Sequence, residues 1–229
     1  MMKIIKFYVN ERTRNFGLPL PAKRVLPDWF KKAESFFTDK DGTKSAGLKK
    51  CMPYMDAMIS GYVITFPTDV EVSTDEDGDL SLSWDRKTPF GNFINERPGG
   101  LGATMPRPKG FAPNHLVFSG KWAWKTPRGW STLVTHPLNR DDLPFRTVSA
   151  IMDSDAYSSG GNIPFFIEEG FSGTIKAGTP IAQILPVKRS SWKMVFDKGM
   201  KDTVEIKSTI VRNPDTPYSK IAWHRKKFD

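Results

Sequence analysis

The chain has 229 residues, of which 38% are hydrophobic and 12% aromatic, a composition typical of a globular protein and not of a disordered one. Its single cysteine, Cys51, excludes an intrachain disulfide, and with three scattered histidines the sequence contains no zinc-type ligand cluster. No window holds the roughly 18 continuous apolar residues of a membrane helix, and the short, charged N-terminus differs from a secretory signal, so we expect neither.

The net charge of +9 is distributed unevenly along the chain. Residues 1–50 carry a net charge of +7, residues 51–185 carry −4, and residues 186–229 carry +6. Basic ends around a mildly acidic centre favour an acidic partner surface, either nucleic acid or an acidic protein. The alternative interpretation is that the basic ends are solvated faces and flexible tails.

Residues 1–50 are expected to form a basic N-terminal arm. Lys3–Val9 alternates like a short edge strand, and Gly17–Pro21 is typical of an extended, polyproline-like segment. Pro27–Phe37 is predicted to be a short helix, because proline and aspartate suit its first turn and its apolar residues fall on one face.

Residues 51–190 are expected to form the core, in which short apolar or alternating runs are separated by turn residues. The acidic turn Asp75–Asp79 is predicted to close a hairpin, and Lys87–Pro113 is predicted to be a long loop, functional or lying against a neighbouring subunit. Many short strands favour an antiparallel β-sandwich or barrel. The predicted strands include Tyr62–Phe66, Val70–Ser73, Leu80–Trp84, His115–Ser119, Lys121–Lys125 and Trp130–Thr135.

Two further predicted strands carry the polar residues of a candidate site. Thr147–Met152 is interpreted as a buried strand that runs into a turn containing Asp153 and Asp155. Ile181–Val187 is an apolar strand in which Gln183 is the one strongly polar residue. A β-scaffold of this kind would present the acids and the amide as one polar site.

Residues 191–229 are predicted to contain a closing strand, Thr203–Val211, and a basic, aromatic and extended tail. Arms of this kind can reach onto a neighbouring molecule. Sequence-independent nucleic-acid binding through the arms is therefore one of the functions we consider.

Several of these motifs resemble the trimeric dUTPase and dCTP deaminase superfamily, over roughly residues 60–189. Ser60-Gly-Tyr-Val-Ile64 resembles the opening motif of that superfamily, with Val63 in place of its acid. The strand leading to Tyr157 and the strand carrying Gln183 resemble two later motifs of the superfamily. His136-Pro-Leu-Asn-Arg140 lies where the deaminases have Ser-Ser-Leu-Ala-Arg, so the arginine is kept and the phosphate-holding serines are replaced.

The resemblance implies a mainly β fold, an antiparallel β-sandwich or barrel of dUTPase-like type. It also implies a homotrimer, because that fold builds its sites between subunits. The residue patterns add a short N-terminal helix and extended terminal arms to this fold. Ser158 replaces the general-base glutamate of the deaminases, and the glycine-rich tail of the dUTPases has no counterpart. These replacements favour a retained fold without the catalytic set.

If the chain does act on nucleotides, the resemblance and the residue chemistry indicate which side chains would do so. Asp153 would position water and His136 would replace the base, so these two are the catalytic candidates. The candidate ligand-binding residues are Arg140, Arg146, Asp155, Tyr157 and Gln183, with Lys176 as a further phosphate ligand. We expect no metal site and no cofactor, except Mg²⁺ for nucleotide hydrolysis.

A structural interpretation of the same residues is also open. Asp153 and Asp155 would cap a turn, and Arg140 would pair with Asp141 or Asp142. His136, which precedes a proline, would be a packed residue at the end of a strand.

A second resemblance, from Pro21 to Trp192, is to an uncharacterised protein family of T4-like phages of marine cyanobacteria. It is carried by the runs Lys49–Tyr62, Thr135–Phe145 and Asn162–Phe166. It implies a viral origin and a location in the host cytoplasm or the virion, and we expect no membrane partner. The leading expectation is a non-catalytic binding or structural protein; the alternative binds or hydrolyses a pyrimidine or modified nucleotide.

Overall fold

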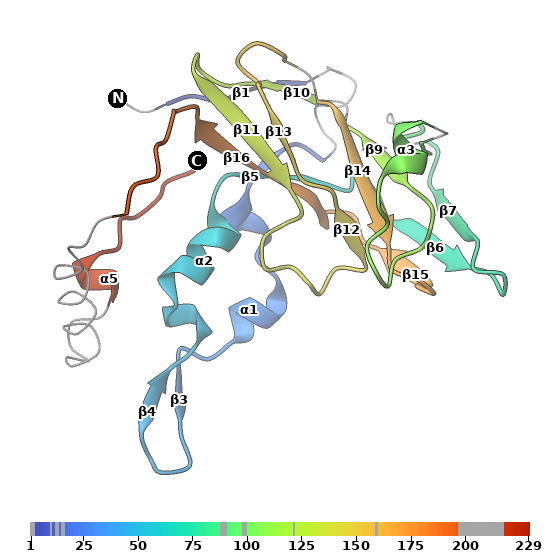
Figure 1. Ribbon diagram of the computed structural model, residues 1–229. Coiled ribbons are helices and arrows are strands. Elements are labelled where there is room, and N and C mark those ends of the chain that lie inside the picture. Colours follow the sequence, from blue (N-terminus) through green and yellow to red (C-terminus); the bar gives the residue numbers. More distant parts are fainter. Residues whose placement is uncertain are drawn as a thin grey trace. The chain divides into compact units, whose positions relative to one another are not determined.

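The computed structural model describes residues 3–9, 11, 14, 17–87, 91–97, 100–120, 122–158, 160–196 and 218–229. The chain groups into two compact units (Figure 1). The first comprises Met1–Leu26 and Met58–Arg189, and the second comprises Pro27–Ala57 and Ser190–Asp229. Residues 1–26, expected as part of an arm, group with the core because two of their strands pair with core strands.

The first unit is mainly β, as predicted, and all of its strand pairs are antiparallel. One sheet has the strand order β13-β11-β16-β5-β2, a second β12-β14-β9-β8, a third β15-β6-β7, and β1 pairs with β10 (Figure 1). The described strands do not close into a barrel. Their bounds are β1 Lys6–Val9, β2 Leu20–Pro21, β5 Tyr62–Thr65, β6 Val70–Thr74, β7 Leu80–Trp84, β8 Ile94–Glu96, β9 Leu116–Ser119, β10 Trp122–Lys125, β11 Trp130–Thr135, β12 Phe145–Thr147, β13 Ala150–Met152, β14 Asn162–Ile167, β15 Gly173–Ile175 and β16 Pro180–Lys188. Two short helices, η1 Ala22–Val25 and α3 Leu101–Thr104, complete the unit.

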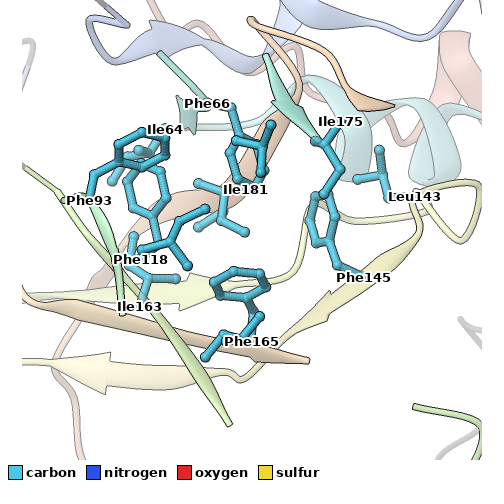
Figure 2. Close-up of a cluster of buried hydrophobic side chains, with 14 of the residues drawn as sticks. Ile64, Phe66, Phe93, Phe118, Leu143, Phe145, Ile163, Phe165, Ile175 and Ile181 are labelled. Atoms are coloured by element: carbon cyan, nitrogen blue, oxygen red, sulfur yellow. The ribbon is translucent and has the colours of Figure 1, made fainter. Parts of the chain in front are cut away.

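One hydrophobic cluster is shared by the three larger sheets (Figure 2). Phe66 lies within it and makes edge contacts with Phe118, Phe145 and Phe165, at ring-centroid distances of 5.6, 5.5 and 6.4 Å. Edge-to-face packing of this kind adds to the free energy gained from burying the rings. The core therefore holds the sheets, and with them the strand ends that carry the candidate site.

The prediction of one strand over Thr147–Met152 is wrong in one respect, because the structure divides this stretch between two sheets. Phe145–Thr147 forms β12 and pairs with β14, whereas Ala150–Met152 forms β13 and pairs with β11. Among the described strands, β13 lies at the edge of its sheet, and Ile151 is 72% exposed. The alternation of apolar residues predicts a buried face, but Ala150 and Ile151 are exposed and Met152 is only half-buried.

The long loop predicted for Lys87–Pro113 is also partly wrong. It contains the strand β8, which pairs with β9, and the single helical turn α3. Ile94 is buried in the shared core, and this burial fixes the strand in a stretch rich in glycine and proline. The other strands predicted in residues 60–135 and 181–187 are confirmed, with ends that differ by a few residues.

The described residues of the second unit also form short elements. They are α1 Asp28–Lys32, β3 Phe36–Thr38, β4 Lys44–Ala46, η2 Leu48–Lys50, α2 Met52–Ile59, whose last two residues belong to the first unit, and α5 Tyr218–Ile221. The predicted helix Pro27–Phe37 ends early because Phe36 pairs with Ala46 in the hairpin of β3 and β4. The helix α2 is not among the elements predicted from the sequence.

The C-terminal tail is not wholly extended, because its described part begins with the helical turn α5. Asp56 of α2 accepts hydrogen bonds from the Trp223 indole, at 2.8 Å, and from the Lys226 ammonium. The predicted strand Thr203–Val211 lies outside the described residues. No helix in the described part of the chain is long and apolar enough to span a membrane.

Candidate functional site

The candidate site residues are distributed around the central strand β11. Because Thr132 pairs with Met152, the turn that follows β13 lies at the Trp130 end of β11. Thr135 pairs with Gln183, so Gln183 and the turn starting at His136 lie at the other end. Ser131 and Thr135 are four positions apart, a distance of roughly 13 Å at about 3.3 Å per residue.

Asp155 forms the strongest contact at the Trp130 end. Its carboxylate accepts hydrogen bonds from the backbone N–H of Gly129, at 2.7 Å, and from both terminal nitrogens of the Arg189 guanidinium, Nη1 at 2.8 Å. The Arg189 hydrogen bonds, followed by that of Gly129, hold the pKa of Asp155 far below its usual range, and the same pair raises the pKa of Arg189. The Asp155 side chain is only 7% exposed, so this pair holds the turn in place.

Asp153 is the more open of the two acids. Its Oδ1 accepts hydrogen bonds from the Ser131 hydroxyl, at 2.6 Å, and from Arg189 Nη1, at 3.1 Å. Its backbone carbonyl accepts the N–H groups of Ala156 and Tyr157, which closes the turn. The Asp153 side chain is 64% exposed, and the Tyr157 ring is also exposed.

Between the two acids, Ser154 is fully buried in a network of hydroxyl groups. Its Oγ lies 2.7 Å from Thr126 Oγ1 and also bonds to Thr132 Oγ1, which accepts the Trp124 indole N–H at 3.2 Å. The carbonyl of Ser154 accepts the N–H of Thr126 at 3.3 Å. Buried polar groups need such partners, so this network fixes the turn between β10 and β11 against the turn after β13.

Ser131, Ser154 and Arg189 belong to this end of β11 but are not among the residues predicted from the sequence. Arg189 directly follows the strand that pairs with β11, and Lys188, the last residue of that strand, lies opposite Trp130. This position at the end of a strand is the feature that could have indicated Arg189. Buried serines carry no comparable signal, because serine is equally common in exposed turns.

His136, at the opposite end of β11, has both ring nitrogens bonded to the main chain. Nε2 lies 3.1 Å from the carbonyl oxygen of Arg140, and the N–H of Thr147 points to Nδ1 at 3.3 Å. This arrangement requires a neutral ring with its proton on Nε2. Burial is the main cause that lowers the pKa of His136, and Phe145 packs edge-on against the ring at 5.9 Å.

Arg140 forms a two-point ion pair with Asp142, with Nε to Oδ1 at 2.8 Å and Nη2 to Oδ2 at 3.0 Å. Arg146 is exposed on β12, and Lys176 pairs with Asp69 at 2.9 Å. The guanidinium of Arg140 and the ammonium of Lys176 are thus each paired with a carboxylate of the same chain.

Gln183 is buried and joins two segments of the backbone. Its Nε2 donates to the carbonyl of Ser60 at 2.6 Å, and its Oε1 accepts the N–H of Leu138 at 2.9 Å. The amide therefore bridges the entry to β5 and the turn that contains Arg140. This is a structural use of the one polar residue in an apolar strand.

The structure thus brings Asp153 and Asp155 together, and separately groups Gln183 with His136 and Arg140. Within one chain the two groups do not converge on a common pocket. Among the described residues, no three His, Cys, Asp or Glu side chains come together in a way that could hold a metal ion. No protein-family model and no curated protein matches the chain.

Proposed function

We propose that this chain is a phage-encoded, non-catalytic binding or structural protein that keeps a dUTPase-like fold and acts in the host cytoplasm or the virion. The observation that carries the proposal is the separation of Asp153 from His136 and Arg140 by the length of β11. Hydrolysis needs a positioned carboxylate and a base within hydrogen-bond reach of one reacting water.

The state of the predicted catalytic base supports the same conclusion. A general base needs a free ring nitrogen that can take a proton, but both nitrogens of His136 are bonded to backbone groups. Its lowered pKa follows from burial and makes the ring a poorer proton acceptor at neutral pH. Arg140, the proposed phosphate ligand, is neutralised by Asp142.

The partner that fits this function has an acidic surface, because the basic residues are concentrated in 1–50 and 186–229. We propose that three copies assemble, as dUTPase-like folds do. The exposed edge strand β13, with Ile151 at 72% exposure, offers an apolar surface for such an assembly.

One observation favours the alternative, a protein that binds or hydrolyses a pyrimidine or modified nucleotide. Asp153 is largely exposed, and a second subunit could bring Arg140 or Arg146 to it. Such a site would need Mg²⁺ to bridge the acid and the phosphates.

A thermal-shift screen against nucleoside mono-, di- and triphosphates, with and without magnesium, decides between the two. A ligand at about 100 times its dissociation constant adds about 2.7 kcal/mol of apparent stability. No shift, together with no phosphate release from the triphosphates, is the expected result. A shift for one nucleotide class that is lost in both Arg140→Ala and Asp153→Asn, but kept in Lys109→Gln, would overturn the proposal.

A further inference from the structure

A basic groove lies in the first unit between β1 and the turn that follows β10, and none of the candidate site residues lines it. Its volume is about 420 Å³. The lining residues are Ile4, Lys6, Tyr8, Lys125, Thr126, Pro127 and Arg128. We propose that this basic groove binds single-stranded nucleic acid, with backbone phosphates on its three cations and a base on its tyrosine. The inference rests on the proposed binding function and places a binding site outside the C-terminal tail.

The groove gathers three positively charged side chains. Lys6 and Lys125 lie directly opposite each other in the β1–β10 pair, an arrangement that is destabilising for like charges. Arg128 adds a third cation three residues after the end of β10. Among the described residues, no carboxylate lines the groove or pairs with these three side chains. A phosphate chain would neutralise them.

The groove also carries an exposed aromatic ring. Tyr8 lies on the same face of β1 as Lys6, because residues two apart in a strand share a face. The residue opposite Tyr8 is the small Ala123, and the ring is 48% exposed. Basic surfaces interleaved with exposed aromatic rings bind single strands, because every base has a face that can stack.

One side of the groove is held in place by hydrogen bonds. The turn that carries Arg128 is held by Ser154, which accepts the N–H of Thr126, and by Asp155, which accepts the N–H of Gly129. The N–H of Arg189 donates to the carbonyl of Gly129 at 2.9 Å. The Asp155–Arg189 pair is therefore a positioning device for the groove, and a preformed site loses less conformational entropy on binding.

An unpaired strand fits this groove better than a duplex or an acidic peptide. A duplex keeps its base faces stacked inside, so Tyr8 would be unused. A peptide of aspartate and glutamate would neutralise the cations but would leave the ring without a stacking partner.

The test is a fluorescence-anisotropy titration of the full chain with a labelled single-stranded oligothymidylate at several salt concentrations. In Lys6→Gln/Lys125→Gln we expect at least a tenfold loss of affinity and a salt slope smaller by about 1.4, since each phosphate contact on a single strand contributes about 0.7. In Tyr8→Leu we expect a several-fold loss of affinity with an unchanged salt slope, because stacking releases no counterions.

The matched control is Lys40→Gln/Lys109→Gln, which removes the same charge at two exposed lysines outside the groove. An equal loss in control and groove variants would overturn the inference, as would binding of a poly-glutamate peptide with no binding of the oligonucleotide. Melting curves of all variants exclude unfolding as the cause. Failure here leaves the nucleotide screen unaffected, so the groove and the non-catalytic function are judged separately.

Discussion

Asp155 and Arg189 form a two-point ion pair that joins the turn after β13 to the end of β16. The same carboxylate accepts the N–H of Gly129, so three segments distant in sequence meet at one side chain. The acid that the sequence pointed to as a ligand-binding residue is thus a structural anchor of the turn that carries Arg128.

The Asp155 anchor predicts an acid-sensitive fold. Because its pKa is lowered in the folded state, the unfolded chain binds the proton first as the pH falls below about 4. The stabilisation is present above that pH and is lost toward lower pH. We expect Asp155→Asn to lower the melting temperature at pH 7 and to flatten its pH dependence below pH 4. Thermal melts between pH 2.5 and 7 measure both, with Asp153→Asn as the control that has the smaller effect.

The His136 contacts predict a specific tautomer. The ring carries its proton on Nε2 and stays neutral at pH 7, and its pKa is below the ordinary value because of burial. Stability that depends on this ring is present above about pH 6.5 and decreases as the pH falls, since the unfolded histidine is protonated first. Nitrogen-15 NMR of the imidazole reports the tautomer. A ring protonated on Nδ1, or one that titrates above pH 6.5, would contradict the structure.

Replacement of Phe66 is predicted to lower the stability of the core strongly. Phe66→Ala removes a ring that contacts three other phenylalanines and should lower the free energy of unfolding by about 3–5 kcal/mol. The control is Phe196→Ala at an exposed ring, which should change it by no more than about 0.5 kcal/mol. Urea unfolding measures both. Equal effects would show that Phe66 does not lie at the centre of the core.

Gln183 is predicted to act through stability. Gln183→Leu leaves the carbonyl of Ser60 and the N–H of Leu138 without their partner, and each such buried group costs about 1–3 kcal/mol. Hydrogen exchange should accelerate at the Leu138 amide more than at amides of β9. An unchanged exchange rate would remove the structural role assigned to this side chain.

The proposed trimer predicts that the mass of the protein in solution depends on β13. Light scattering of the purified protein should give three times the mass of 25.9 kDa, and Ile151→Lys should reduce it because a charge cannot be buried in an apolar contact. Lys109→Gln is the matched surface control. A monomeric wild-type protein would refute the assembly.

The sequence by itself determined the β-rich class and most of the strands, because alternating apolar residues and turn formers are local signals. It also singled out Gln183, since a lone amide in an apolar strand has few explanations. The sequence also indicated that Arg140 has a structural role. Arg140 pairs with Asp142, which is only two positions away in the chain, so this contact is local.

Only the tertiary structure decided which strand ends meet. Thr147 and Ala150 are three residues apart but lie in different sheets, and no local pattern encodes this division. Asp155 and Arg189 meet because β16 and β13 both pair with β11, a relation set by register across the whole sheet. The same long-range pairing separates Asp153 from His136 and places Lys6 opposite Lys125. Sheet pairing joins residues far apart in the chain, so the contacts that define a site depend on the fold as a whole.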